Sequence, residues 1–364
     1  MKRLLFVLAA CGSKPEPPAP TNPVEPVALS ADATPPAPPA DPEVWLRGST
    51  HVHAKASGDS KTPLPEVIEW YETRGYDFLV LTDHNQVSEL DPALDTTGKP
   101  FLRDPAKGLI VIAGIEWTQN INGCTPPGDA STKCRIHLNQ LGVLARPRRK
   151  LTEWRDPRPR DRLAIYDTAL AAGRSFGGLL QVNHPQWFWG MNEQLLVDLA
   201  TRGIVLYELW NKAFRTWNPG DADHPSTEAL WDAALARGAT LWGVASDDAH
   251  HYNDSGKYPA GGAWVSVKAR RDPQAILDAL ATGRFYASTG VTLARAEVER
   301  GELVVEIAAA DSASSITFVT NGRRSTVSGK TARHQVPVTG YVRAVVERAD
   351  GAKAWTQPAR SGRP

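Results

Sequence analysis

Short apolar runs separated by amphipathic stretches constrain the fold of this chain more than any other feature. Eight runs between residues 45 and 267 have the length and content of buried strands, and the segments between several of them repeat apolar residues at helical spacing. Repeated strand–helix units predict an α/β fold, and this many strands over roughly 240 residues favours a closed barrel, with a doubly wound sheet as the alternative. The expected strands are 45–50, 78–82, 109–113, 136–144, 179–182, 204–209, 240–244 and 263–267.

The pattern of apolar and turn-forming residues changes after Gly290. Short β-like runs follow, separated by the turn dipeptides Asn321-Gly322 and Asp350-Gly351. This pattern predicts a small β-rich C-terminal domain at 291–364. We expect no chemistry in it, since it has one histidine and no clustered carboxylates.

The N-terminus has the pattern of an export signal. Lys2 and Arg3 precede a short apolar run at 4–10, which is too short to span a bilayer. The run ends in small residues before Cys11, as in a bacterial lipobox, whose cysteine is lipidated. We therefore expect a lipoprotein signal at 1–11 that anchors the exported protein to the cell envelope. An ordinary N-terminus is the alternative.

The next segment, 12–42, is rich in proline and alanine and nearly lacks aromatic residues. Such a composition cannot bury enough apolar surface to fold, so it predicts a disordered tether. The whole chain contains 41 basic and 40 acidic residues, which gives a net charge of +1. No summed field favours nucleic acid, and we expect none as a partner.

Three cysteines occur, Cys11, Cys124 and Cys134, and none forms the paired pattern of a thiolate zinc site. Any bound metal should therefore be held by histidines and carboxylates. Export implies an oxidising compartment, in which we expect a disulfide between Cys124 and Cys134. Two unpaired cysteines are the alternative.

Six of the nine histidines lie at or just beyond the ends of expected strands. Each of them alone is more often a hydrogen-bonded structural residue than a metal ligand. Side chains at one end of barrel strands, however, converge on a single face, so the set together predicts a metal site. The segments concerned are His51-Val52-His53, Thr82-Asp83-His84-Asn85, Glu116, His137, Asn183-His184-Pro185 and Ser246-Asp247-Asp248-Ala249-His250.

These segments, in this order, resemble the PHP (polymerase and histidinol phosphatase) family over roughly residues 48 to 290. The segments Asn183-His184-Pro185, Glu208-Leu209-Trp210-Asn211 and Gly283-Arg284-Phe285-Tyr286 are most similar to its CehA/McbA branch of carbaryl-hydrolase-like proteins. The resemblance implies a PHP-type distorted (β/α)7-like barrel at 43–290, followed by the small all-β domain.

The resemblance also implies two or three divalent ions, of Zn, Mn or Fe. His51, His53 and Asp248 would hold one ion, and Glu116 would bridge it to a second. Asp248 is preferred to Asp247 because the family motif needs an aspartate two residues before the final histidine. His137 and His184 would complete the second ion, and a third would be held by Asp59, His84 and His250.

Further residues beside these segments are candidates for catalysis or substrate binding. Asp83 could orient His84 or move a proton, and Asp247 could act on a product proton. Basic side chains close to the ligand segments could clamp a phosphate or leaving group; Lys55 and Arg215 are the first choices, with Arg135 and Lys212 beside them. Glu208 and Asn211 are expected to line the pocket. The aromatic residues Trp187, Phe188 and Trp189 either pack the rim or stack on a substrate.

The leading functional hypothesis is a metal-dependent phosphoesterase or phosphodiesterase acting on a small organic phosphate through a metal-bridging hydroxide. Several divalent ions leave a positive pocket that suits an oxyanion. Hydrolysis of a carboxylic or carbamate ester is the alternative that the CehA/McbA resemblance permits. A nuclease and a non-enzymatic surface lipoprotein are further alternatives.

Overall fold

The computed structural model describes residues 42–362, apart from 92, 126–132, 157 and 254–257. From Asp41 to Pro364 the chain forms one compact unit. The expected signal, lipobox cysteine and tether lie outside the described residues, except for the last residue of the tether. None of the described helices is long and apolar enough to cross a membrane.

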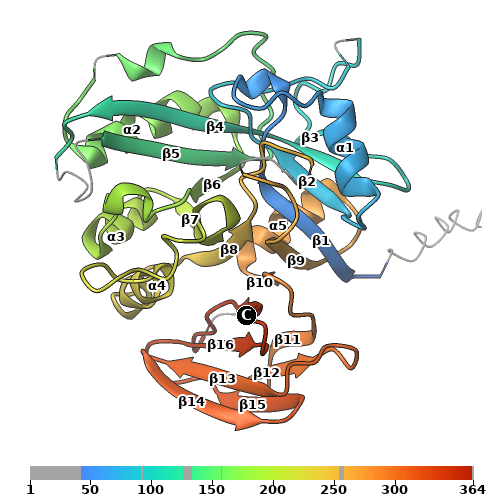
Figure 1. Cartoon of the computed structure of the whole chain (residues 1–364), viewed down its shortest axis with the longest axis vertical. Coiled ribbons are helices and arrows are strands. Elements are labelled where there is room, and N and C mark those ends of the chain that lie inside the picture. The colour runs from blue at the N-terminus through green and yellow to red at the C-terminus, as the bar shows by residue number, and fades with distance from the viewer. Residues whose placement is uncertain (1–41, 92, 126–132, 157, 254–257, 363–364) are drawn as a thin grey trace, which may run out of the picture. The chain divides into compact units, whose positions relative to one another are not determined.

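A mixed 14-stranded sheet runs through the whole unit (Figure 1). Its main path has the order β14-β13-β16-β17-β10-β9-β1-β2-β4-β5-β6-β7-β8, and β3 pairs with β4. The strands are β1 (Val44–Val52), β2 (Phe78–Leu81), β3 (Phe101–Arg103), β4 (Ile110–Asn122), β5 (Lys133–Leu141), β6 (Leu179–Val182), β7 (Ile204–Asn211), β8 (Trp242–Ser246), β9 (Trp264–Ala269), β10 (Phe285–Ser288), β13 (Ser315–Thr320), β14 (Arg323–Ser328), β16 (Val342–Glu347) and β17 (Lys353–Thr356).

Five α-helices connect strands in the first part of the unit. They are α1 (Leu64–Glu72), α2 (Arg162–Gly173), α3 (Glu193–Thr201), α4 (Thr227–Ala236) and α5 (Pro273–Thr282). Four of them begin at a polar side chain that accepts a hydrogen bond from a first-turn N–H, which satisfies one otherwise unpaired donor; these caps are Asp161, Asn192, Ser226 and Asp272. Single 3₁₀ turns occur at η1 (Lys55–Ser57), η2 (Glu153–Arg155), η3 (Arg174–Phe176), η4 (Trp187–Trp189) and η5 (Lys212–Phe214).

The central strands are buried on both faces, which explains their continuous apolar runs. In β2, Phe78 and Val80 join one core cluster, whereas Leu79 and Leu81 join another. This division follows from the alternation of side chains along a strand. The first cluster also takes in Leu206 of β7, Val244 of β8 and side chains of α5. Strand β2 and the strands β7 and β8 at one end of the main sheet therefore share one core with α5.

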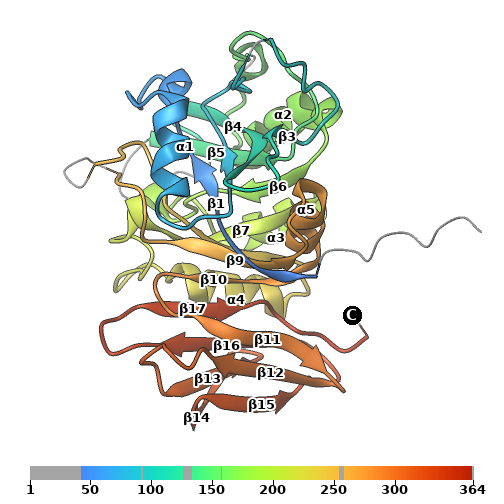
Figure 2. The ribbon, with the colours of Figure 1, turned by 90° about the vertical axis from the view of Figure 1, so that its right-hand side faces the viewer.

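The C-terminal strands are continuous with the main sheet. Strand β10 pairs with β9 on one side and with β17 on the other, so β17, β16, β13 and β14 extend the same sheet. A second sheet, in the order β11-β12-β15, is formed by β11 (Leu293–Glu299), β12 (Glu302–Ile307) and β15 (Thr331–Gln335). It lies beside β13 and β16 (Figure 2), and the two sheets share an apolar core that includes Val305 and Phe318.

The expected helix-flanked (β/α)7-like barrel with a separate all-β domain is therefore wrong. Strands β4 and β5 form a long antiparallel hairpin, and β5–β6, β1–β9 and β9–β10 are antiparallel as well. Only β1–β2, β2–β4, β6–β7 and β7–β8 are parallel pairs among the described strands of this part. An apolar run shows that a strand is buried but does not show the direction of its neighbour.

Candidate metal centre

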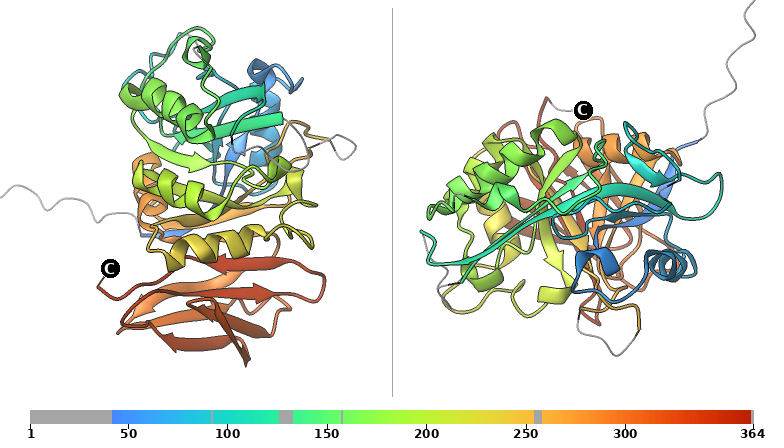
Figure 3. Two further views of the ribbon diagram at one scale, coloured as in Figure 1. Left: turned by 90° about the vertical axis from the view of Figure 1, so that its left-hand side faces the viewer. Right: turned by 90° about the horizontal axis from the view of Figure 1, so that it is seen from above.

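Polar side chains gather where the parallel strands end. His51 lies near the end of β1, His53 follows it, and His84 comes three residues after β2. Asp248 and His250 follow β8, and an isolated parallel bridge from Val52 to Ala249 brings the ends of β1 and β8 together. Hairpin β4–β5 supplies Glu116 and His137 from within its strands. The right-hand view of Figure 3 shows β4 and β5 crossing over this end of the unit.

His51, His53 and Asp248 form the first of three groups that could hold a metal ion. Asp248 Oδ1 lies 3.3 Å from His51 Nε2 and 3.2 Å from His53 Nε2. Both imidazoles are fully buried, and Asp248 is 5% exposed. This is the set that the resemblance implies for one ion.

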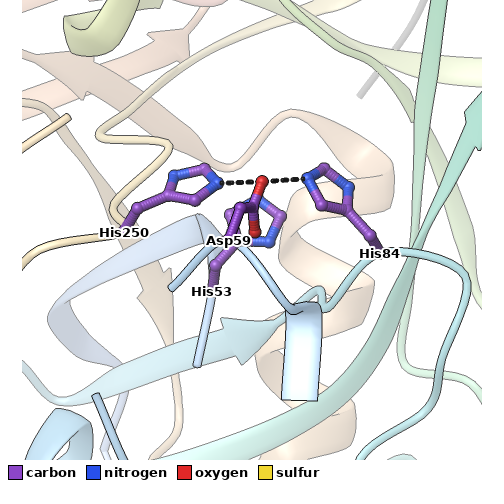
Figure 4. Close-up of side chains that lie close together, drawn as sticks. All are labelled: His53, Asp59, His84 and His250. Atoms are coloured by element: carbon purple, nitrogen blue, oxygen red, sulfur yellow. Dashed lines mark hydrogen bonds and ion pairs between the residues drawn. The ribbon is translucent and has the colours of Figure 1, made fainter. Parts of the chain in front are cut away.

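The second group contains His53, Asp59, His84 and His250. Asp59 Oδ2 lies 3.0 Å from His84 Nε2 and 3.2 Å from His250 Nε2, between the two rings (Figure 4). Three of these residues are the implied ligands of a third ion, and a ring nitrogen of His53 lies close enough to their ligand atoms to join the group. The His53 ring also stacks on that of His250, with 4.2 Å between centroids. Asp59 is the most exposed member, at 51% of its side chain.

Glu116 is the carboxylate of the third group, with His84 and His137. Its Oε2 lies 2.6 Å from His84 Nδ1, and its Oε1 lies 3.0 Å from His137 Nδ1. His184 Nε2, which the resemblance implies for the same ion as His137, is 3.7 Å from Glu116 Oε1. The structure thus brings all nine implied ligands into one cluster but places His84, rather than His184, in the group with Glu116.

The donor set of this cluster fits a divalent cation. The Nε2 atoms of His51 and His53 are buried and have no hydrogen-bond partner. Their Nδ1 atoms are engaged by Glu208 and Ser57, so each Nε2 is the ring atom that faces carboxylate oxygens. A nitrogen and an oxygen that face one another in a dry site repel unless a proton or a metal cation lies between them. Mixed imidazole and carboxylate ligands are typical of zinc, manganese and iron sites.

The protonation of the cluster reflects the same electrostatics. Burial disfavours the charged form of His51, but Asp248, Glu208 and Glu116 together hold its pKa well above the usual value. Burial and the nearby His250 and His84 lower the pKa of His53 to about 3. One imidazole therefore tends to carry a proton that a metal ion would have to displace, and the next is already neutral.

Several further residues orient the implied ligands, and few of them could be recognised from the sequence. Ser57 Oγ lies 2.9 Å from His53 Nδ1, and Thr118 Oγ1 lies 2.7 Å from His84 Nδ1. Asn183 donates from Nδ2 to Glu116 Oε1 at 2.8 Å. Hydroxyl and amide side chains occur throughout any sequence, so only the Asn-His-Pro segment gave a signal for one of them. Such contacts fix the ring orientation and tautomer of metal-binding histidines.

Asp247 engages backbone amides rather than the centre of the cluster. Its Oδ1 accepts hydrogen bonds from the N–H groups of Gly262 and Ala263, both at 2.9 Å, and its Oδ2 accepts from Gly261 at 2.7 Å and from the Tyr71 hydroxyl at 3.4 Å. Burial raises the pKa of Asp247 to about 6. These contacts hold the segment before β9 in place.

Asp83 is placed in a similar way. Its Oδ1 accepts a hydrogen bond from the Ala54 N–H at 2.8 Å, and its Oδ2 accepts one from Ser88. Burial raises the pKa of Asp83 to about 6. The carboxyl group thereby secures the segment after β1, which carries His53, instead of bonding to His84.

The basic candidates differ in position. Lys55 and Arg215 are exposed at the surface. Lys212 donates from Nζ to the carbonyl oxygen of Gly261 at 2.9 Å. The Arg135 guanidinium lies 5.6 Å from the Trp187 ring centroid, and its Nε is buried without a hydrogen-bond partner among the described residues. Arg135 thus packs beside the Trp187 ring, which in turn covers His137 and His184.

Aromatic rings cover one side of the cluster. Trp187 packs edge-on against His137 and His184, with centroids 5.4 and 5.1 Å apart, and Phe214 lies 4.5 Å from His184. Packing of this kind excludes water from the imidazoles and restricts their motion. Phe188 stacks on Trp187, and Trp189 stacks on His224, so all three rings of this segment pack against other side chains of the protein.

Several non-glycine residues here have positive φ angles. The φ angle is 23° at His184, 51° at Asp248, 57° at Phe188, 53° at Trp189 and 59° at Tyr258. Such conformations cost free energy and persist where the surrounding structure enforces them, which is common at functional sites. Two of the five residues are implied metal ligands.

The predicted disulfide between Cys124 and Cys134 is present, with Cα atoms 5.7 Å apart. It joins the segment just after β4 to the start of β5. The two sulfurs thus close the tip of the hairpin that carries Glu116 and His137.

No known family model matches the chain, and no curated protein is detectably similar to it in sequence. The resemblance to the PHP family therefore depends on the motif residues themselves.

Proposed function

We propose that this protein is a metal-dependent hydrolase of the PHP type that cleaves small organic phosphate esters. The observation that carries the proposal is the convergence of five histidines, Glu116, Asp59 and Asp248 into three overlapping groups that could each hold a metal ion, with a sixth histidine, His184, 3.7 Å from Glu116. When bound, divalent ions would supply Lewis acidity and charge neutralisation to a water molecule and its ester. The protein's residues would bind the ions, orient them and keep their surroundings dry.

Charge favours a phosphate as the substrate. The three groups contain one carboxylate each, namely Asp59, Asp248 and Glu116. Three divalent ions in these groups would bring more positive charge than these carboxylates and the adjacent buried Glu208 neutralise, and a phosphate dianion would balance the excess. A carboxylic or carbamate ester would offer less negative charge, although the rings of Trp187 and Phe214 beside His184 suit an apolar ester.

A substrate panel on the metal-loaded protein tests the proposal. The full chain is stripped with chelator, reloaded with Zn²⁺, Mn²⁺ or Fe²⁺ in turn, and assayed with phosphate monoesters, phosphodiesters, and carboxylic and carbamate esters. Metal-dependent turnover of a phosphate ester above all other classes supports the proposal. Turnover of carboxylic or carbamate esters alone would replace it by the ester hydrolase, and no metal uptake would exclude both.

We further propose that the protein is exported and anchored to the cell envelope through a lipid on Cys11. The disulfide between Cys124 and Cys134 supports export, because such bonds persist in oxidising compartments. Replacing Cys11 by Ser should move the protein from the membrane fraction to the soluble fraction. Continued membrane association of that variant would contradict the lipid anchor.

A further inference from the structure

Glu208 is a carboxylate buried beside the metal cluster that belongs to none of the three candidate groups. It lies on β7, its side chain is fully buried, and Leu206 two residues earlier belongs to the core cluster around α5. Alternation along the strand places Glu208 on the same face as Leu206. An acid in such a position is costly unless every oxygen lone pair finds a donor.

Each of the two carboxylate oxygens of Glu208 accepts two hydrogen bonds. His51 Nδ1 lies 2.8 Å from Oε1, and the Ser246 hydroxyl donates to the same oxygen. The backbone N–H of His184 donates to Oε2 at 2.5 Å, and Asn211 donates to it at 2.9 Å. One carboxylate thereby joins β1, the segment after β6 and the end of β8.

These contacts determine where His51 carries its proton. A carboxylate accepts hydrogen bonds and donates none, so the His51 Nδ1 that faces Glu208 must carry hydrogen. The neutral ring then has its lone pair on Nε2. That atom is buried without a hydrogen-bond partner and lies 3.3 Å from both Asp248 Oδ1 and Glu116 Oε1.

We propose that Glu208 is a positioning residue that selects the metal-binding tautomer of His51 and fixes the backbone that presents His184. The inference rests on the proposed metal centre and deepens it. His184 has a φ angle of 23°, and the hydrogen bond from its own N–H to Glu208 holds the backbone in that strained conformation. Asn211 extends the effect, because its amide also lies 3.4 Å from Asp248 Oδ2.

The decisive variant is Glu208→Gln. Glutamine keeps the size but offers one accepting oxygen and one NH₂ donor to a site that contains four donors. If the oxygen stays with His184 and Asn211, the NH₂ group faces His51 Nδ1, which must then accept. The ring proton moves to Nε2 and occupies the lone pair that would bind the metal. We expect Zn²⁺ affinity to fall on the order of 10- to 100-fold.

Glu228→Gln is a matched control. Glu228 is a mostly buried carboxylate that pairs with Arg343 of the C-terminal strands and belongs to none of the candidate metal groups. Zn²⁺ affinity is measured by competition with a chromophoric chelator on the full chain, with circular dichroism to establish the folded fraction. The ¹⁵N shifts of the His51 ring, recorded at a pH above its pKa where the ring is neutral, report its tautomer independently of activity. We expect weaker binding and an inverted tautomer in Glu208→Gln, and parental values in the control.

The outcomes separate the two proposals. If the parent protein binds no Zn²⁺, the proposed function fails. If the parent binds Zn²⁺ and the folded Glu208→Gln variant binds it equally well, the positioning role is refuted and the metal centre stands. Should Glu208→Gln not fold, Glu208→Asp keeps the charge but withdraws it by one methylene group. A weaker Zn²⁺ affinity in the folded Asp variant supports the role, and an unchanged affinity overturns it.

Discussion

Glu116 is in contact with more histidines than any other carboxylate among the described residues. Five imidazoles have a nitrogen between 2.6 and 3.7 Å from its two oxygens, and they come from four different segments of the chain, at His51 and His53, His84, His137 and His184. Burial alone would favour its neutral form, yet His137, His84 and His51 hold the pKa of Glu116 well below its ordinary value. The carboxylate is therefore ionised and available to bridge cations.

We predict that Glu116→Gln loses at least one metal ion and lowers turnover by about a hundredfold, or roughly 3 kcal/mol of transition-state stabilisation. The amide keeps the shape of the side chain but removes a negative charge and most of its capacity to bridge. The measurement is metal content by mass spectrometry together with kcat on the best ester of the panel. Unchanged metal content and turnover would make Glu116 a structural acid and remove the centre of the assignment.

At the scale of single elements, the β4–β5 hairpin is the largest difference from the strand–helix repeat that the sequence suggested. Glu116 pairs with Asn139, and His137 pairs with Thr118, so the hairpin register places the two implied ligands side by side. Eight apolar runs correctly located strands β1, β2 and β4 to β9. Their directions, and therefore the topology, depend on long-range pairing that no local pattern contains.

The candidate ligands were easier to predict than the fold because strand ends and metal-ligand residue types coincide in the sequence. His51, His53 and Asp248 are brought together as the resemblance implies. The roles of Asp83 and Asp247 depend on rotamers, and in the structure both carboxylates engage backbone N–H groups. A sequence motif identifies a residue as a candidate, but its role depends on hydrogen-bond partners that can lie far away in the chain.

The Cys124–Cys134 bond allows a test of the hairpin tip. The two cysteines are ten residues apart, so replacing both by serine should lower the free energy of unfolding by about 2 to 3 kcal/mol through the added freedom of the unfolded chain. Zn²⁺ affinity of the folded variant should match the parent, since Glu116 and His137 lie further along the strands. Chemical denaturation and chelator competition measure the two quantities. A loss of Zn²⁺ affinity without a loss of stability would contradict the prediction that the disulfide stabilises the fold and leaves metal binding unchanged.

At the scale of the molecule, the C-terminal strands and the helix-bearing part share one sheet and a buried ion pair. Arg343 on β16 is fully buried and donates to Asp232 from Nε and Nη2, both at 2.7 Å, and to Glu228 at 3.0 Å. Both acids belong to α4. The guanidinium also lies 5.0 Å from the Trp231 ring centroid. Loss of these contacts should therefore destabilise both α4 and the C-terminal strands that pack against it.

We predict that residues 42–362 unfold as one cooperative unit and that Arg343→Met lowers its stability by about 3 kcal/mol. Methionine fills a similar volume but leaves Asp232 and Glu228 without their shared cation, the usual cost of breaking a buried ion pair. Because Trp355 and Val345 belong to the same core cluster as Tyr207 and Trp231, weakening the junction should weaken both regions together. Urea unfolding followed by tryptophan fluorescence and by far-ultraviolet circular dichroism should give coincident transitions, both shifted to lower urea in the variant.

Lys330→Met, which changes an exposed cation of the C-terminal region, is the control and should leave the midpoint nearly unchanged. Two separate transitions, of which Arg343→Met shifts only one, would mean that the C-terminal strands fold independently despite their pairing with β10.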